Sequence, residues 1–132
     1  MDELTLEQVF PVSADKIYRD FLDSETHSMM TGDTAVISDK KGAKFTAWGG
    51  YISGKNLELV PGKKIRQRWR TTDFSKKDKD SEIEITLEEI GSSKTKFTLK
   101  HTKIPDGDGN KYKEGWQDYY LAPMLEHYLA PS

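Results

Sequence analysis

The sequence predicts an α+β fold in which two short helices follow a first strand, further antiparallel strands come next, and a long helix ends the chain. Apolar and polar residues alternate at the start of the chain and again in segments between residues 34 and 101, which indicates strands. Apolar residues at helical spacing occupy residues 14–22 and 111–129. Turns that contain glycine or proline separate the strand-like segments, so we expect a sheet of six to seven strands.

Length and composition indicate one domain that spans residues 1–132. Of the 132 residues 35% are hydrophobic, enough to bury one core. The net charge of −2 argues against binding nucleic acid through a generally basic surface. Cysteine is absent, which excludes disulfides, thiolate catalysis and cysteine-bound zinc or iron–sulfur clusters. Because the chain has no signal-peptide pattern and no apolar run long enough to cross a membrane, we expect a cytoplasmic protein.

The first third of the chain predicts one strand and two helices. Leu4–Phe10 alternates with a period of two, and Pro11 ends the strand because proline cannot donate to a ladder. Ser13 occupies the N-cap position of a helix that extends to Leu22. Ser24 is a suitable cap for a second short helix that ends by Gly32.

Strands and turns follow. A short strand is predicted at Thr34–Ser38, before a turn. Phe45–Trp48 and a strand that starts at Tyr51 and continues through Val60 flank Gly49-Gly50, which predicts a hairpin because glycine tolerates the positive φ of tight hairpin turns. The polar segment of residues 75–80 predicts a mobile hairpin loop.

Three strands carry charge on one face and apolar residues on the other. Lys64–Arg70 places arginine and lysine outward, Glu82–Glu88 places glutamate outward, and Lys94–His101 places lysine outward. In an antiparallel meander these stripes pair across strands, each pair being worth about 0.2–1 kcal/mol. The glutamates then neutralise the arginines, and the aromatic side chains lie on the opposite face. Both features argue against binding of nucleic acid here.

A long helix from about Lys111 to Leu129 ends the chain, with Asp108 or Asn110 as its cap. Two groups of apolar side chains occupy different sides of this helix. The first comprises Tyr112, Trp116, Tyr119 and Tyr120, and the second Leu121, Met124, Leu125, Tyr128 and Leu129. Pro123 lies between the two groups and removes a backbone hydrogen bond, so we expect a kink there.

No motif identifies a reaction or a metal. The loop at Asp106–Asn110 resembles half of an EF-hand, but Lys111 stands where the central glycine belongs and Gln117 where the glutamate ligand belongs. The three histidines lack metal-binding spacing, and no nucleophile or phosphate-loop motif is present. His101 and Gln67 lie on the inward face of their strands, so they must find partners in each other, in water or in a ligand.

The order of these elements resembles the helix-grip fold of the START-like (SRPBCC) superfamily, in which a curved antiparallel sheet wraps around the last helix and encloses a cavity. Within it, the sequence resembles the family of the activator of heat-shock-protein-90 ATPase, and specifically that family's C-terminal-type domain. The Asn-Trp-His-Trp signature of that family's N-terminal activating domain has no counterpart in this sequence. The matching segments are Tyr18-Arg19-Asp20-Phe21-Leu22, Lys44-Phe45, Ser53-Gly54, Leu59-Val60-Pro61, Gln67-Arg68-Trp69-Arg70, Ile104-Pro105 and Gly115-Trp116-Gln117-Asp118-Tyr119-Tyr120.

This resemblance implies two classes of function. The superfamily implies a module that binds a small apolar or aromatic ligand between the sheet and the last helix. The nearer family implies a chaperone-interacting protein, and an unidentified hydrolase or cyclase is a third alternative. For the ligand site we predict the residues Trp48, Gln67, Trp69, Phe97, His101, Trp116 and Tyr120. We expect a monomer without cofactor, metal, nucleic-acid partner or membrane association.

Overall fold

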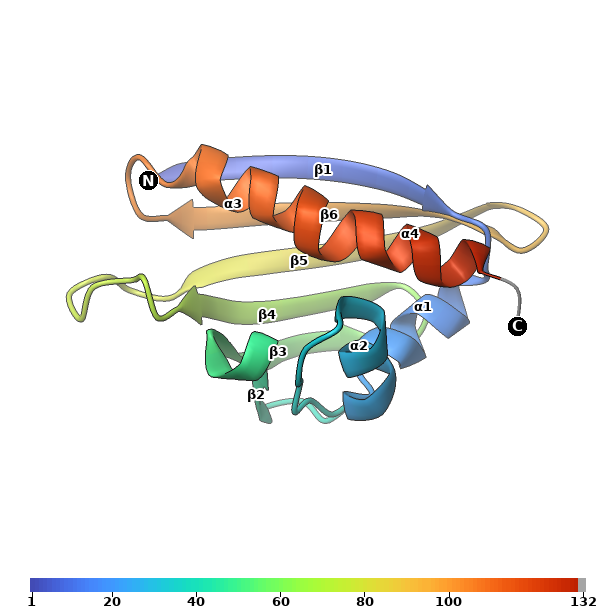
Figure 1. Ribbon diagram of the computed structural model, residues 1–132, viewed down its shortest axis with the longest axis horizontal. Coiled ribbons are helices and arrows are strands. Elements are labelled where there is room, and N and C mark those ends of the chain that lie inside the picture. The colour runs from blue at the N-terminus through green and yellow to red at the C-terminus, as the bar shows by residue number, and fades with distance from the viewer. Residues whose placement is uncertain (131–132) are drawn as a thin grey trace.

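The computed structural model describes residues 1–130 and shows one six-stranded antiparallel sheet with all helices packed on one of its faces (Figure 1). The strand order is β1-β6-β5-β4-β3-β2, so the first and last strands of the chain lie side by side. The sheet consists of β1 (Asp2–Phe10), β2 (Lys44–Ala47), β3 (Ile52–Val60), β4 (Lys64–Thr71), β5 (Ser81–Gly91) and β6 (Lys94–Ile104). The helical segments are α1 (Ala14–Phe21), α2 (Ser24–Thr31), the 3-10 turn η1 (Trp48–Gly50), α3 (Gly109–Trp116), the π-helical segment η2 (Gln117–Leu121) and α4 (Ala122–Leu129).

The predicted start of the first helix is confirmed, whereas the predicted cap of the second is wrong. The hydroxyl of Ser13 accepts a hydrogen bond from the backbone N–H of Lys16 and caps α1. Asp23 rather than Ser24 caps α2, because its carboxylate accepts from the backbone N–H of Thr26 at 3.0 Å. A carboxylate also suits the positive end of the helix dipole, and it leaves Ser24 free for another contact.

The short strand predicted at Thr34–Ser38 does not form. Within the described residues this segment makes a single isolated β-bridge to the sheet, between Val36 and Thr46. The hydroxyl of Ser24 instead bonds both backbone groups of Ile37, and the hydroxyl of Ser28 accepts from the backbone N–H of Ala35. Two α2 serines therefore satisfy backbone groups that a strand would have paired, and the sheet has six strands.

The predicted hairpin is confirmed, with a longer connection than expected. β2 and β3 pair from Lys44–Lys55 to Ala47–Ile52, and the turn between them has positive φ at Trp48, Gly49 and Gly50. Trp48 therefore lies in the turn and not in the strand. Gly54 in β3 is required by packing, because a Cβ there would lie 2.7 Å from the Phe45 ring and 1.9 Å from the carbonyl oxygen of Arg68.

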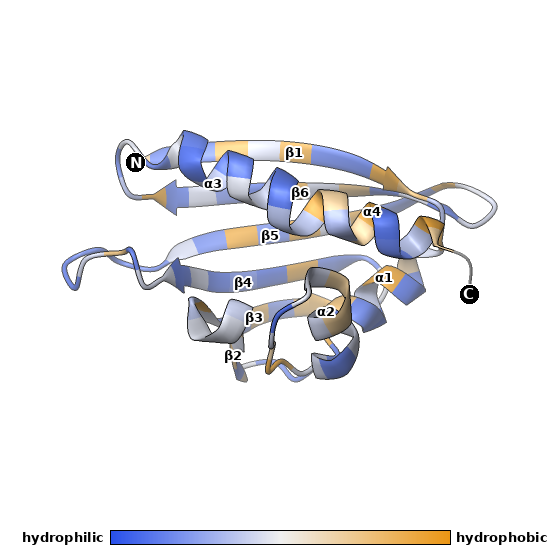
Figure 2. Cartoon of the chain, viewed as in Figure 1, coloured by the Kyte–Doolittle hydropathy of each residue, from blue (hydrophilic) through white to orange (hydrophobic). Residues whose placement is uncertain are grey.

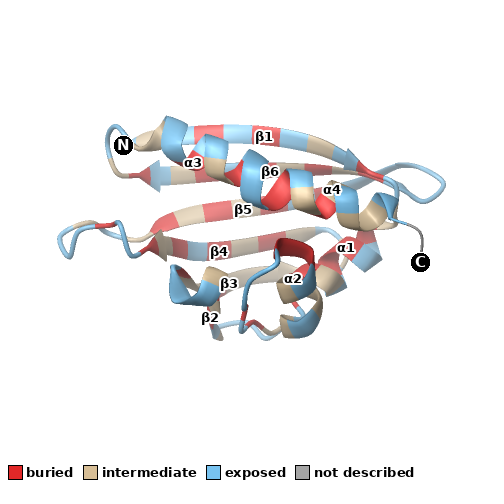
Figure 3. Cartoon of the chain, viewed as in Figure 1, coloured by how far each residue is buried: buried red, intermediate tan, exposed pale blue. Residues whose placement is uncertain are grey.

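The alternation predicted for the three charged strands is confirmed (Figures 2 and 3). Ile65, Ile83, Ile85 and Leu99 are fully buried. On the outer face the register places Arg66 opposite Glu84, Glu84 opposite Lys100, and Glu88 opposite Lys96.

The prediction that the glutamate strand neutralises every arginine is only partly correct. Arg70 pairs with Asp80 at 2.8 Å and donates to the carbonyls of Ser75 and Asp78, so it fastens the loop that connects β4 to β5. Arg68 makes no ion pair within residues 1–130.

The last helix is continuous but irregular (Figure 1). A π-helical segment precedes Pro123, and in it the backbone N–H of Ala122 donates to the carbonyl of Gln117, five residues earlier. The kink expected at Pro123 stays a prediction. Tyr112, Trp116 and Tyr120 are buried, as the aromatic stripe predicted. The prediction that Tyr119 belongs to the same stripe is wrong, since it is 58% exposed. Tyr119 lies in the π-helical segment, whose wider turn moves a residue three positions after Trp116 off the face that Trp116 shares with Tyr112.

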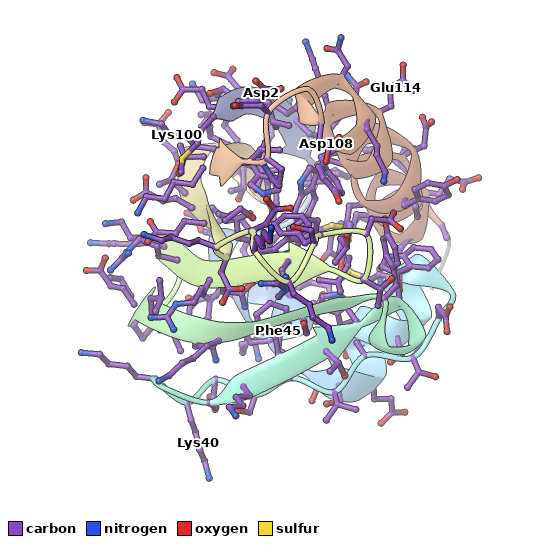
Figure 4. The ribbon with its side chains drawn as sticks, turned by 90° about the vertical axis from the view of Figure 1, so that its left-hand side faces the viewer. Asp2, Lys40, Phe45, Lys100, Asp108 and Glu114 are labelled. Atoms are coloured by element: carbon purple, nitrogen blue, oxygen red, sulfur yellow. The ribbon has the colours of Figure 1, made fainter. Side chains whose placement is uncertain are left out.

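Of the two caps predicted for this helix, Asp108 occupies the N-cap position. The side chain of Asp108 makes no capping bond. The carboxylate of Asp2, at the start of β1, accepts from the backbone N–H groups of Gly107 at 3.0 Å and Gly109 at 2.9 Å. Figure 4 shows Asp2 beside the loop that leads into α3. A residue distant in sequence thus joins the first strand to the start of the last helix.

We predict that Asp2→Ala lowers the free energy of unfolding by about 1 kcal/mol, since it removes the only carboxylate bound to this helix start in the described chain. Urea denaturation measures the change. Glu3→Ala, on the exposed face of the same strand, is the matched control and is expected to leave stability unchanged. Equal stability of both variants would contradict the capping role.

Candidate functional site

A cavity of about 320 Å³ lies between the last helix and the end of the sheet formed by β3 and β4. Aromatic side chains make most of its wall, and all three tryptophans of the chain contribute. Tyr51 and Tyr119, which line its opening, are partly exposed to solvent. The lining residues are Trp48, Tyr51, Ile52, Trp69, Lys111, Tyr112, Gly115, Trp116, Tyr119 and Tyr120.

Four of the seven residues predicted for a ligand site line this cavity, namely Trp48, Trp69, Trp116 and Tyr120. The other three do not. Phe97 lies in β6, which two strands separate from β3 in the sheet. Its ring packs edge-on against that of Phe10, at 5.5 Å between ring centroids. Gln67 and His101 are fully buried behind the wall.

His101 occupies the centre of a buried chain of hydrogen bonds. The indole Nε1–H of Trp116 donates to His101 Nδ1 at 3.1 Å, and His101 Nε2 lies 2.8 Å from the hydroxyl of Ser81. That hydroxyl donates to the carbonyl of Trp69 at 2.6 Å. Because an indole N–H can only donate, Nδ1 must accept and the proton of the neutral ring lies on Nε2. The chain therefore runs in one direction, from Trp116 through His101 and Ser81 to Trp69.

Burial without a charged partner lowers the pKa of His101 to about 3. Both ring nitrogens are occupied by protein groups, so the imidazole is neutral and its bonds are used in holding α3 against the sheet.

Gln67 belongs to a second buried network, on the β3 side. Its Nε2 donates to Asn56 Oδ1 at 2.9 Å, and Asn56 Nδ2 donates to the carbonyls of Ser38 and Lys40. Gln67 Oε1 has no partner within residues 1–130. Asn56, whose strand position gave no sign of this role, fastens the loop before β2 to the sheet.

A third polar link joins α2 to the last helix. His27 Nδ1 lies 2.8 Å from the carbonyl of Phe21, and His27 Nε2 lies 2.8 Å from the hydroxyl of Tyr120. A carbonyl only accepts, so Nδ1 carries the proton and Tyr120 donates to Nε2. Burial lowers the pKa of His27 and raises that of Tyr120, so both are neutral near pH 7. Single-sequence patterns did not reveal this pair, because its members lie 93 residues apart.

An ion pair stands at the opening of the cavity. Lys111 Nζ lies 2.7 Å from Asp73 Oδ2, and the hydroxyl of Tyr51 donates to the same oxygen at 2.6 Å. The hydrogen bond from Lys111 lowers the pKa of Asp73, and Asp73 raises the pKa of Lys111. The pKa of Tyr51 is raised to about 12, mainly by burial and next by the hydrogen bond to Asp73. The one charged side chain that lines the cavity is thus neutralised by a neighbour.

The cavity is therefore an uncharged aromatic pocket. No group of three His, Cys, Asp or Glu side chains among residues 1–130 is arranged to hold a metal ion. None of the helices in this part of the chain has the length and apolar character that crossing a bilayer requires.

We predict that the free energy of unfolding falls as pH drops below about 6.5. Below that pH the His101 side chain is protonated in the unfolded chain but stays neutral in the folded protein. Since the folded pKa is about 3, the contribution of this group reaches about 1.4 kcal/mol per pH unit between those values. Urea denaturation from pH 7 to pH 4 measures the slope, and His101→Gln is expected to make it shallower. An unchanged slope in the variant would contradict a neutral buried imidazole.

Comparison with known proteins shows the family of the chain. Residues 11–130 match the family described as "Activator of Hsp90 ATPase homolog 1-like protein". The Dictyostelium discoideum protein named activator of 90 kDa heat shock protein ATPase homolog is 32% identical over 98% of this chain and 33% of its own length. The human homolog 1 is 30% identical over 90% of this chain and 35% of its own length. The chain thus spans about a third of these relatives.

Solved structures agree with the fold. A structure described as an HSP90 activator from Plasmodium falciparum superposes with a TM-score of 0.86 at 24% identity, covering 96% of this chain and 95% of that one. A protein from Chromobacterium violaceum superposes with a TM-score of 0.78 at 24% identity, covering 99% of this chain and all of that one. The fold is the helix-grip fold of the START-like superfamily, and the chain belongs to the family of activator of Hsp90 ATPase homolog 1-like proteins.

Proposed function

We propose that this chain is a domain that binds a 90-kDa heat-shock chaperone. The observation that carries the proposal is the family match over residues 11–130, together with relatives of at least 30% identity that are named as activators of that chaperone's ATPase. These relatives act on another protein's ATPase by name, which supports a non-catalytic role for the chain. Because the chain spans about a third of their length, the proposal is limited to binding of the chaperone and does not include activation of its ATPase.

The arrangement of the fold supports this role. All helices pack on one face of the sheet, so the other face is open to a partner (Figure 4). That face carries the charged side chains of β4, β5 and β6, and Lys100 projects from it. Exposed charges speed the association of two proteins, and the attraction between opposite charges weakens as salt is added. A complex formed through this face is therefore expected to depend on ionic strength.

We predict that the purified chain binds a purified 90-kDa heat-shock protein and that the complex weakens as NaCl is raised from about 0.05 M to about 0.5 M. Sedimentation velocity with fluorescently labelled chain measures the binding. Tyr119→Ala, which alters the cavity opening but not the sheet face, is expected to bind as the original chain does. Absence of a complex at low salt would contradict the proposal.

A second function, favoured by one observation, is the binding of a small neutral apolar or aromatic molecule. The cavity volume of about 320 Å³ falls at the lower end of the range for small-molecule sites. Seven of the ten lining residues are aromatic, and Lys111 is paired with Asp73. A charged ligand would lose its hydration without gaining a free partner here, so a neutral ligand suits the site.

Gly115 allows a direct test of this second function. It lies in α3 on the cavity wall, and a Cβ at this position meets no atom within 4 Å. The Cβ of either substitution therefore meets no atom, and the leucine of Gly115→Leu is expected to occupy part of the cavity that Gly115→Ala leaves open. Both changes should raise stability, Gly115→Ala by about 0.5–1 kcal/mol, because glycine is unfavourable inside a helix.

We predict that tetralin, a neutral two-ring hydrocarbon, changes the tryptophan fluorescence of the original chain and of Gly115→Ala but not of Gly115→Leu. The three tryptophans on the cavity wall report occupancy directly. Urea denaturation of each variant controls for folding. An equal response from Gly115→Leu would place the hydrocarbon elsewhere and contradict the cavity site.

A further inference from the structure

Three cations lie directly opposite one another on the outer face of β2, β3 and β4. Lys44 pairs in register with Lys55, and Lys55 pairs in register with Arg68. Side chains at directly paired positions point to the same face, and neighbouring strands lie about 4.8 Å apart. Lys44 and Arg68 are exposed and Lys55 is partly exposed. We call Lys44, Lys55 and Arg68 the basic row.

The basic row departs from the rest of this face. Elsewhere the sheet sets opposite charges against each other, as in Arg66 with Glu84 and Glu84 with Lys100. Like charges directly opposite are unfavourable. None of the ion pairs among residues 1–130 involves a member of the basic row.

The two neighbouring carboxylates that could neutralise the basic row are bound elsewhere. Glu82 lies opposite Arg68 in the register, but its carboxylate lies 3.6 Å from Arg66 and 3.2 Å from Lys103. Glu58 in β3 pairs with Lys64 and Arg66. The basic row is thus an exposed cluster of three positive charges on a chain whose net charge is −2.

The loop before β2 adds to this positive surface. Lys40 and Lys41 are exposed, and the backbone N–H of Gly42 donates to the carbonyl of Asn56, beside Lys55. Figure 4 shows Lys40 projecting from the end of the sheet where β2 lies.

We infer that the basic row is a docking surface for an acidic segment of a partner protein. Carboxylates supply the charge that the row lacks, and they would relieve the repulsion between its members. The buried aromatic rings of β4 and β6 lie on the other face, so nucleobases would find no stacking surface here. The inference does not depend on the proposed chaperone, because it rests on the charges alone.

The test compares two triple variants of the full chain that lose the same charge from the same face. Lys44→Gln, Lys55→Gln and Arg68→Gln remove the basic row. Lys94→Gln, Lys96→Gln and Lys100→Gln remove three of the four lysines of β6, two of which face glutamates in register. The probe is a fluorescein-labelled peptide of alternating glutamate and serine, with a glutamine–serine peptide as the uncharged control, and fluorescence anisotropy measures binding.

We expect the original chain to bind the acidic peptide and not the uncharged one, with an affinity that falls as salt is added. Loss of the basic row should weaken binding about tenfold, whereas loss of the β6 lysines should change it far less. The urea midpoint of the basic-row variant should equal or exceed that of the original chain, because a repulsion is removed.

Three results would overturn the inference. The first is equal binding of the acidic peptide by both triple variants. The second is binding of duplex DNA or of phosphatidylserine vesicles at least as tight as that of the peptide, which would assign the row to phosphates. The third is a lowered urea midpoint in the basic-row variant, which would show that the row stabilises the sheet.

Discussion

The position of the last helix depends on the bond that Trp116 makes to a neutral buried histidine. Apolar packing holds a helix on a sheet but fixes its register weakly, because hydrophobic contact is not directional. The chain from Trp116 through His101 and Ser81 to the carbonyl of Trp69 joins α3 to β6, β5 and β4 in one direction. A satisfied buried network of this kind specifies one arrangement, since every misplacement leaves a buried polar group unpaired.

Hydrogen bonds from the tips of aromatic rings recur along the helix, and they explain why a cavity remains beside it. Tyr112, Trp116 and Tyr120 follow at intervals of four, and the polar tip of each ring bonds a different element, through Thr71 in β4, His101 in β6 and His27 in α2. Rings held at both ends cannot rotate to fill the space beside them. The unfilled volume is therefore a consequence of how the helix is anchored. The two proposed functions use different parts of the fold, the ligand site this cavity and the partner site the uncovered face of the sheet.

Local patterns predicted the fold well, because strand alternation and helical spacing act over a few residues. The strands of β4–β6 and the N-cap Ser13 follow directly from such patterns. The predictions that failed depend on contacts between residues distant in the sequence. Asp2 replaces a local cap from across the chain, and α2 serines replace a strand at Thr34–Ser38. Likewise, the alternation along the strands predicted that Gln67 and His101 point inward, and both are buried. Alternation does not tell whether an inward polar group meets a ligand or another side chain.

Nuclear magnetic resonance of the histidine ring nitrogens tests the anchoring most directly. For His101 the account predicts the neutral tautomer with its proton on Nε2 from pH 7 to below pH 5, and slow exchange of the Trp116 indole proton with solvent. A proton on Nδ1, a charged ring at pH 5, or rapid exchange of that indole proton would contradict it.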